Sequence, residues 1–195
     1  MKAGLVLTLK NSLLSWCRIG SFKGFMGTFC RYAFHLLVAM LVLMPSPGMA
    51  IPLGALAPDF RLPDLEGRQV SLSDFRGQVV LVKLATTWCP SCSQLSSELA
   101  QAGEFLKESN VVLLDVFVQD TKEMVAQYLE KHSYPMTFNA LIDDGQAYKA
   151  YNVYLIPRLL VIDPQGVARY DSAGQVPTAT ELRGLVTEAL GEKSG

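Results

Sequence analysis

Histidine and cysteine are scarce in most of this 195-residue chain, and both shortages restrict its chemistry. Beyond residue 50 there is one histidine, His132, and there are two cysteines, Cys89 and Cys92. A zinc site needs about four ligands, so these side chains are too few and we expect no metal site. The sequence also has no motif that indicates a bound cofactor, no internal repeat and no low-complexity segment.

Acidic residues are missing from the first 50 positions, whereas all 18 of them lie in the remainder, together with 12 basic residues. Residues 51–195 therefore carry a net charge of −6, which argues against nucleic acid as a partner because nucleic acid calls for a basic face. The length of this part is that of one domain, and about half of the whole sequence is apolar, so a sizeable core is expected.

The first 50 residues have the organisation of a secretory signal peptide. Five Lys or Arg side chains lie in residues 1–31, an apolar stretch follows at 32–44, and Gly48-Met49-Ala50 gives a small-x-small cleavage pattern. The apolar stretch is shorter than the roughly 20 residues of a membrane span. We predict export to the periplasm or another extracytoplasmic part of the cell envelope. The alternative is an uncleaved anchor, and the leader would then be the only membrane contact. A start at Met26 would give a leader of ordinary length.

Hydrophobic periodicity predicts an α/β domain over residues 51–195. Apolar runs at 79–85 and 111–118 indicate buried strands, and the spacing of apolar residues between them predicts a helix that ends near Lys107. Such a unit implies a parallel strand pair with a right-handed crossover. A hairpin is expected over 59–72. Further strands are expected at 138–142, 158–162 and 167–170, a short helix after 143–145, and capped helices after Asp120 and Thr178.

The two cysteines lie in Trp88-Cys89-Pro90-Ser91-Cys92, where the first buried strand gives way to a helix. Unpaired N–H groups and the helix dipole favour an anion there, and the thiolate is the species that attacks in disulfide exchange. We predict that Cys89 attacks a substrate disulfide at the surface, and that Cys92 faces the core and resolves the mixed disulfide. Pro90 suits the first helical position, and the uncharged Ser91 favours a reductant over an oxidant. A structural disulfide and a pair of inert core cysteines are the alternatives.

The pattern of an apolar strand, Trp-Cys-Pro-x-Cys, a helix and then Ile156-Pro157 before a strand resembles the thioredoxin superfamily. Within it, the exported TlpA/ResA-like branch is the most similar. The segments that carry this resemblance are 57–60 (APDF), 70–77 (VSLSDFRG), 85–89 (ATTWC) and 160–166 (LVIDPQG). The resemblance covers roughly residues 57–190. It implies a thioredoxin fold, that is, a central mixed sheet flanked by helices, with an N-terminal β-hairpin and a helix–strand insert.

The resemblance also implies roles for residues away from the cysteines. Pro157 corresponds to the cis-proline that faces the dithiol, and Ile156 before it would pair with an extended substrate segment. The alternative is an ordinary trans-proline at the start of an edge strand. Lys83 occupies the place of a buried acid or an asparagine, six residues before Cys89, so it would favour the Cys89 thiolate or relay a proton; a snorkelling lysine at a sheet edge is the alternative. Arg158 would contact an acidic partner or lie solvated on its strand.

The resemblance implies an exported thiol–disulfide oxidoreductase that reduces disulfides of envelope proteins and is recharged by a membrane electron donor of the DsbD/CcdA kind. Leu95 stands where many branch members carry Glu, and this departure removes a proton acceptor and argues against a specific role in cytochrome c maturation. One competing function is a thiol peroxidase of the peroxiredoxin type, although Val82 replaces the proline of Pro-x-x-x-Thr-x-x-Cys and only Thr86 fits. Another is a non-catalytic adaptor or metal-delivery module with the same fold.

Overall fold

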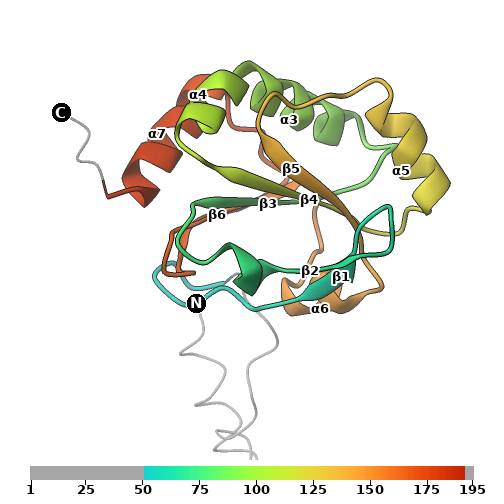
Figure 1. Cartoon of the computed structure of the whole chain (residues 1–195), viewed down its shortest axis with the longest axis horizontal. Coiled ribbons are helices and arrows are strands. Elements are labelled where there is room, and N and C mark those ends of the chain that lie inside the picture. The colour runs from blue at the N-terminus through green and yellow to red at the C-terminus, as the bar shows by residue number, and fades with distance from the viewer. Residues whose placement is uncertain (1–50, 192–195) are drawn as a thin grey trace, which may run out of the picture. The chain divides into compact units, whose positions relative to one another are not determined.

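A five-stranded sheet forms the centre of the computed structural model, which describes residues 51–191 (Figure 1). The strands in spatial order are β5 (Thr137–Ile142), β4 (Val112–Phe117), β3 (Val80–Ala85), β6 (Arg158–Ile162) and β7 (Ala168–Ala173). The first three run parallel to one another, whereas β6 pairs antiparallel with both β3 and β7. The sheet is therefore mixed, as predicted.

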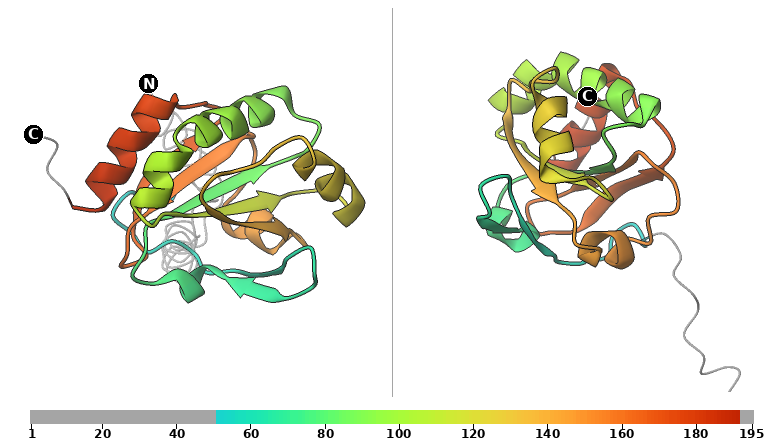
Figure 2. Two further views of the ribbon diagram at one scale, coloured as in Figure 1. Left: turned by 45° about the horizontal axis from the view of Figure 1, so that its top comes forward. Right: turned by 90° about the vertical axis from the view of Figure 1, so that its right-hand side faces the viewer.

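Helices and a hairpin cover the two faces of the sheet (Figures 1 and 2). One face carries α3 (Pro90–Gln101), α4 (Gly103–Glu108) and α7 (Ala179–Ala189). The other face carries the hairpin of β1 (Arg61–Pro63) and β2 (Gln69–Ser71), the 3-10 helix η1 (Leu72–Phe75) and α6 (Gln146–Ala150). The helix α5 (Lys122–Leu129) packs near the ends of β4 and β5. The predicted hairpin and the helix–strand insert of α5 and β5 are thus both present.

The strand β3 contributes side chains to the apolar core on each face of the sheet, because successive residues of a strand point to opposite faces. Val80, Val82 and Leu84 pack under the hairpin, whereas Leu81 packs under α3 and α7. Ala85, on the same face as Leu81, contacts both cysteines. All six residues of β3 are buried, since this strand has a partner on each side and a layer on each face. Lys83 therefore points into the protein on the side of α3.

The helix predicted to run from the cysteines to Lys107 is in fact two helices, α3 and α4, which meet at Ala102. The break coincides with a close approach of Pro135 to Gly103. A Cβ atom added to Gly103 would lie 2.1 Å from the Pro135 Cγ atom, so only glycine fits there. The apolar spacing continues across the junction, with Leu99 and Leu106 both buried, which is why periodicity alone did not reveal it.

Of the two capping boxes that the sequence predicts, one is confirmed and the other is wrong. Thr178 and Glu181 form the predicted capping box at the start of α7. The predicted box of Asp120 and Glu123 is wrong, because α5 is capped by Thr121, whose hydroxyl accepts a hydrogen bond from the Met124 N–H. The Asp120 carboxylate instead contacts the loop before the cysteines.

The predicted signal peptide, residues 1–50, lies outside the part that the structure describes. Among the helices of residues 51–191, none combines the length and the apolar character that a membrane crossing needs.

Candidate dithiol site

Cys89 and Cys92 lie at the first turn of α3, and both are thiols in this structure. Cys89 is the N-cap residue, so its side chain takes the place of the usual capping oxygen. Its sulfur accepts a hydrogen bond from the Cys92 backbone N–H at 3.3 Å and lies 3.2 Å from the Ser91 Oγ atom. Pro90 occupies the first helical position, where a missing N–H costs no hydrogen bond.

Solvent access differs between the two cysteines. Cys89 is 7% exposed and Cys92 is fully buried, so Cys92 faces the core as predicted, whereas Cys89 is more enclosed than we expected. Ala85 and the partly buried Ile156 pack against the pair. Trp88, the residue before Cys89, is in contrast 62% exposed.

The thiol pKa values of the pair are shifted in opposite directions. Burial alone would raise the pKa of Cys89, but hydrogen bonds from Cys92 and Ser91 outweigh burial and hold this pKa below its ordinary value. Burial is also the largest influence on Cys92, and together with its thiol–thiol contact to Cys89 it raises the pKa of Cys92 to about 12. Of the two thiols, Cys89 is therefore the one that loses its proton first as the pH rises.

Lys83 is fully buried behind the cysteines, in the middle of the sheet. Its ammonium group donates to Ser96 Oγ at 2.8 Å and lies 3.0 Å from each carboxylate oxygen of Asp115, its register partner on β4. The Tyr134 hydroxyl lies 3.3 Å from the same nitrogen and donates to Asp115 at 2.8 Å. The alternative of a snorkelling lysine at a sheet edge is therefore wrong.

The positive charge of Lys83 acts on Cys92, and its effect on the Cys89 thiolate stays a prediction. Its positive charge lowers the pKa of Cys92 and so opposes part of the effect of burial, whereas the hydrogen-bonding groups that lower the pKa of Cys89 belong to Cys92 and Ser91. Ser96 joins the two groups, because its hydroxyl contacts Lys83 and also donates to the Cys92 carbonyl at 3.2 Å.

The Ile156–Pro157 peptide bond is cis, as the resemblance implies. The Pro157 carbonyl accepts a hydrogen bond from the Gly174 N–H at 2.8 Å, which joins this turn to the end of β7. Ile156 contacts the cluster of Ala85 and the two cysteines. The structure thus brings together all the residues that we singled out around the dithiol, from positions 83, 88–92 and 156–157.

Asp120 and Arg158 are charged residues near the site, and both are buried in contacts that the sequence did not predict. The Asp120 carboxylate accepts hydrogen bonds from the Thr87 N–H at 2.7 Å and from the Thr87 hydroxyl at 2.9 Å, and so it fastens the loop just before Trp88. Arg158 is 4% exposed and pairs with Asp171, so our expectation of a solvated or partner-facing arginine is wrong. No local motif signals either contact, because 33 residues separate Thr87 from Asp120 and 13 separate Arg158 from Asp171.

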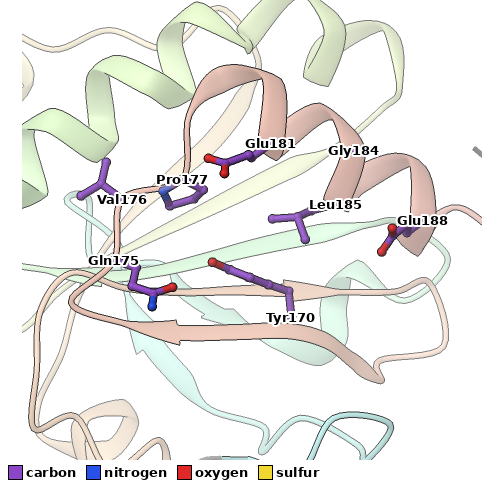
Figure 3. A pocket seen from close by; sticks show the side chains of 8 residues that line it. All are labelled: Tyr170, Gln175, Val176, Pro177, Glu181, Gly184, Leu185 and Glu188. Atoms are coloured by element: carbon purple, nitrogen blue, oxygen red, sulfur yellow. The ribbon is translucent and has the colours of Figure 1, made fainter.

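An open cavity between β7 and α7 lies apart from the cysteines, and Tyr170, Gln175, Leu185 and Glu188 are among its lining residues (Figure 3). None of the predicted site residues lines it. Across residues 51–191 there is no group of three or more His, Cys, Asp or Glu side chains placed to hold a metal ion.

Known proteins match this chain in sequence and in structure. The family model for the AhpC/TSA family matches residues 53–171. A thiol-disulfide oxidoreductase ResA from Geobacillus kaustophilus is 35% identical over 118 residues, which are 60% of this chain and 67% of the relative. A thiol:disulfide interchange protein DsbE from Allochromatium vinosum is 30% identical over 155 residues, covering 77% and 82% of the two chains.

Among solved structures, a Chlorobium tepidum protein described as a DsbE-type thiol:disulfide interchange protein aligns with a TM-score of 0.64 and 27% identity. The alignment covers 72% of this chain and 99% of the other. The arrangement of strands and helices is therefore the thioredoxin fold.

Proposed function

We propose that this chain, which belongs to the AhpC/TSA family and is a thiol–disulfide oxidoreductase, uses Cys89 and Cys92 as its redox-active pair. The observation that carries the proposal is the asymmetry of the two thiols. The Cys89 sulfur accepts hydrogen bonds at the start of α3, has a lowered pKa and keeps some exposure, whereas Cys92 is buried with a pKa of about 12. Cys89 is therefore suited to attack the partner disulfide, and Cys92 is suited to resolve the mixed disulfide afterwards.

The reaction would proceed in two exchanges. The Cys89 thiolate attacks one sulfur of a partner disulfide, a Cys89–partner disulfide forms, and the second partner sulfur leaves as a thiolate. Cys92 then loses its proton and attacks the Cys89 sulfur. The Cys89–Cys92 disulfide forms, and the first partner sulfur leaves as a thiolate. The pair has given two electrons to the partner, and an external dithiol must supply two electrons to restore it.

Other residues of the site support these steps in our proposal. Trp88, Pro90 and Ser91 shape the start of α3 around the Cys89 sulfur. Lys83 supplies a buried positive charge that favours ionisation of Cys92 in the second exchange, when Cys92 must lose its proton. Ile156 packs against the two cysteines, and an extended partner segment would lie against Ile156 and Pro157.

The sequence supports a direction and a setting for the reaction. We infer that the protein reduces disulfides of exported proteins outside the cytoplasm, with cytochrome c maturation as one candidate pathway, because the leader has the pattern of a signal peptide and the cysteines enclose no histidine. A membrane protein of the DsbD/CcdA kind would then restore the dithiol. The two relatives named ResA and DsbE support thiol–disulfide exchange as the reaction. The partner proteins must be identified by experiment.

The decisive experiment is to trap the reaction between its two steps. The Cys92→Ser variant, expressed in the cell envelope, should accumulate a mixed disulfide at Cys89, because the second attack cannot occur. Mass spectrometry of the trapped complexes should identify a cysteine-containing exported protein and a membrane reductase. The Cys89→Ser variant is the matched control and should trap nothing at position 89.

Three results would contradict parts of the proposal. Capture of a folding oxidase alone would reverse the direction of electron flow. Consumption of hydrogen peroxide by the reduced protein at a rate above that of its disulfide exchange would favour the thiol peroxidase. Stoichiometric copper binding without exchange activity would favour a metal-delivery module.

A further inference from the structure

Arg158 carries a buried charge that the dithiol chemistry does not use. Its guanidinium donates to both carboxylate oxygens of Asp171, from Nε at 2.8 Å and from Nη2 at 2.6 Å, and each of the two side chains is only 4% exposed. Removing an ion pair from water costs free energy that its own attraction often fails to repay. A buried pair is therefore weak evidence for stability.

The third guanidinium nitrogen reaches the loop that precedes β6. Nη1 donates to the backbone carbonyls of Tyr151 and, at 3.2 Å, Asn152. One side chain thus ties the end of α6 to β7. A lysine at this position has a single ammonium group and cannot supply the same rigid fork of donors.

The loop between these anchors presents apolar side chains next to the dithiol. Tyr154 is 79% exposed, Leu155 is 61% exposed, and Ile156 packs against the cluster that contains Cys89 and Cys92. Within the described part of the chain, the backbone N–H groups of residues 154–156 donate no hydrogen bond to another backbone group. The segment therefore has free backbone donors and is held in place from its two ends.

We propose that Arg158 is a positioning residue, which holds the segment Tyr154–Ile156 where it receives the cysteine-bearing segment of a partner protein. This inference rests on the proposed function. The partner that fits is an extended polypeptide with uncharged, apolar residues beside its cysteine. The fit follows from the continuity of the segment with the dithiol through Ile156, and from the lack of any charged side chain in residues 86–92 and 153–157.

The test separates partner binding from thiol chemistry. The Arg158→Lys variant keeps the charge opposite Asp171 but loses the fork. We expect its kcat/KM for the reduction of insulin, a protein disulfide, to fall about tenfold through a rise in KM, because a displaced binding segment misplaces the partner. Its reaction with the small disulfide DTNB, and the pH dependence of Cys89 alkylation, should stay within about twofold of the wild type.

Arg169→Lys is the matched control. Arg169 also pairs with a buried aspartate, Asp163, at the far end of the β6–β7 hairpin, and this variant should leave both reactions unchanged. A second variant, Tyr154→Ser with Leu155→Ser, leaves the Arg158 pair intact and should also slow insulin reduction selectively. It keeps the test valid if Arg158→Lys fails to fold.

Equal effects on insulin and DTNB, or no effect on either, in the variants that fold would overturn the proposal. A dimer of the wild-type protein that the Tyr154→Ser, Leu155→Ser variant abolishes would show that a second copy occupies the segment, and would also overturn it. Retention of both reactions by Cys89→Ser would instead refute the proposed function, so the two failures are distinguishable.

Discussion

At the scale of single residues, Lys83 shows how a buried charge is placed by the sheet. Its position six residues before Cys89 is plain from the sequence, but its partner is not, because Asp115 meets it only through the register of β3 and β4. The ammonium group also lies 5.6 Å from the centroid of the Phe117 ring and 5.7 Å from that of Tyr128, within the range of cation–π attraction. These contacts hold the ammonium group in the interior of the protein.

Opposite changes at this pair should have opposite effects on Cys92. Lys83→Met removes the positive charge and should slow the second exchange, whereas Asp115→Asn leaves that charge uncompensated and should speed it. Each effect should be about threefold per unit of change in the Cys92 pKa, because a less acidic thiolate is scarcer but more nucleophilic. With DTNB, the first and second release of the coloured thiol report attack by Cys89 and by Cys92 in turn. The first release should not change.

A shift of both variants in the same direction would indicate a purely structural pair. Breaking a buried ion pair costs about 3–5 kcal/mol, so folding must be checked by circular dichroism. The double variant Lys83→Met, Asp115→Leu has no charge to bury and serves as the folded control. A slower first release in Lys83→Met would instead support the expectation that the lysine favours the Cys89 thiolate.

At the scale of elements, most of the secondary structure was predictable because each strand or helix has its own apolar pattern. The buried strands, the helix that follows the cysteines and the capping box at Thr178 depend on neighbours in sequence, and all are present. The junction of α3 and α4 was not predictable, since it depends on Pro135, 32 residues after Gly103. Contacts of Thr87 with Asp120 and of Arg158 with Asp171 were missed for the same reason.

Two helical glycines should respond oppositely to alanine. Gly184→Ala in α7 meets open space and should raise the free energy of unfolding by roughly 0.5–1 kcal/mol, because alanine is the better helix former. Gly103→Ala places its Cβ against Pro135 and should lower the free energy of unfolding by about 1–3 kcal/mol. Urea denaturation measures both, and equal stabilisation by the two changes would show that Pro135 does not constrain the junction.

At the scale of the whole molecule, the core holds several weak acids in their neutral form. Burial is the chief cause that raises the pKa values of Cys92, Tyr134 and Tyr151 in the folded protein. A group of this kind stabilises the fold below its unfolded pKa, which is 9.0 for cysteine and 10.0 for tyrosine, and the stabilisation is lost as the pH rises toward the folded value.

The free energy of unfolding of the reduced protein should therefore fall as the pH rises above about 9. Urea titrations from neutral to alkaline pH measure this slope. Cys92→Ala and Tyr134→Phe should each make it shallower, whereas Tyr154→Phe, at an exposed position, should leave it as in the wild type. A wild-type stability that is constant up to pH 11 would contradict the expected alkaline loss.

Both ends of the described chain lie on the side of the molecule away from the dithiol. Residues 54–57 pair with 166–168 beyond the end of β6, next to the first residue of β3, whereas the dithiol follows the last residue of β3. The helix α7 begins beside α3, where the Ala179 N–H donates to the Glu98 carboxylate, and ends at Ala189 (Figure 1). Coupling the domain to a bead or an electrode through residue 51 or residue 191 should therefore leave its reactive thiol facing the bulk solution, unobstructed by the support.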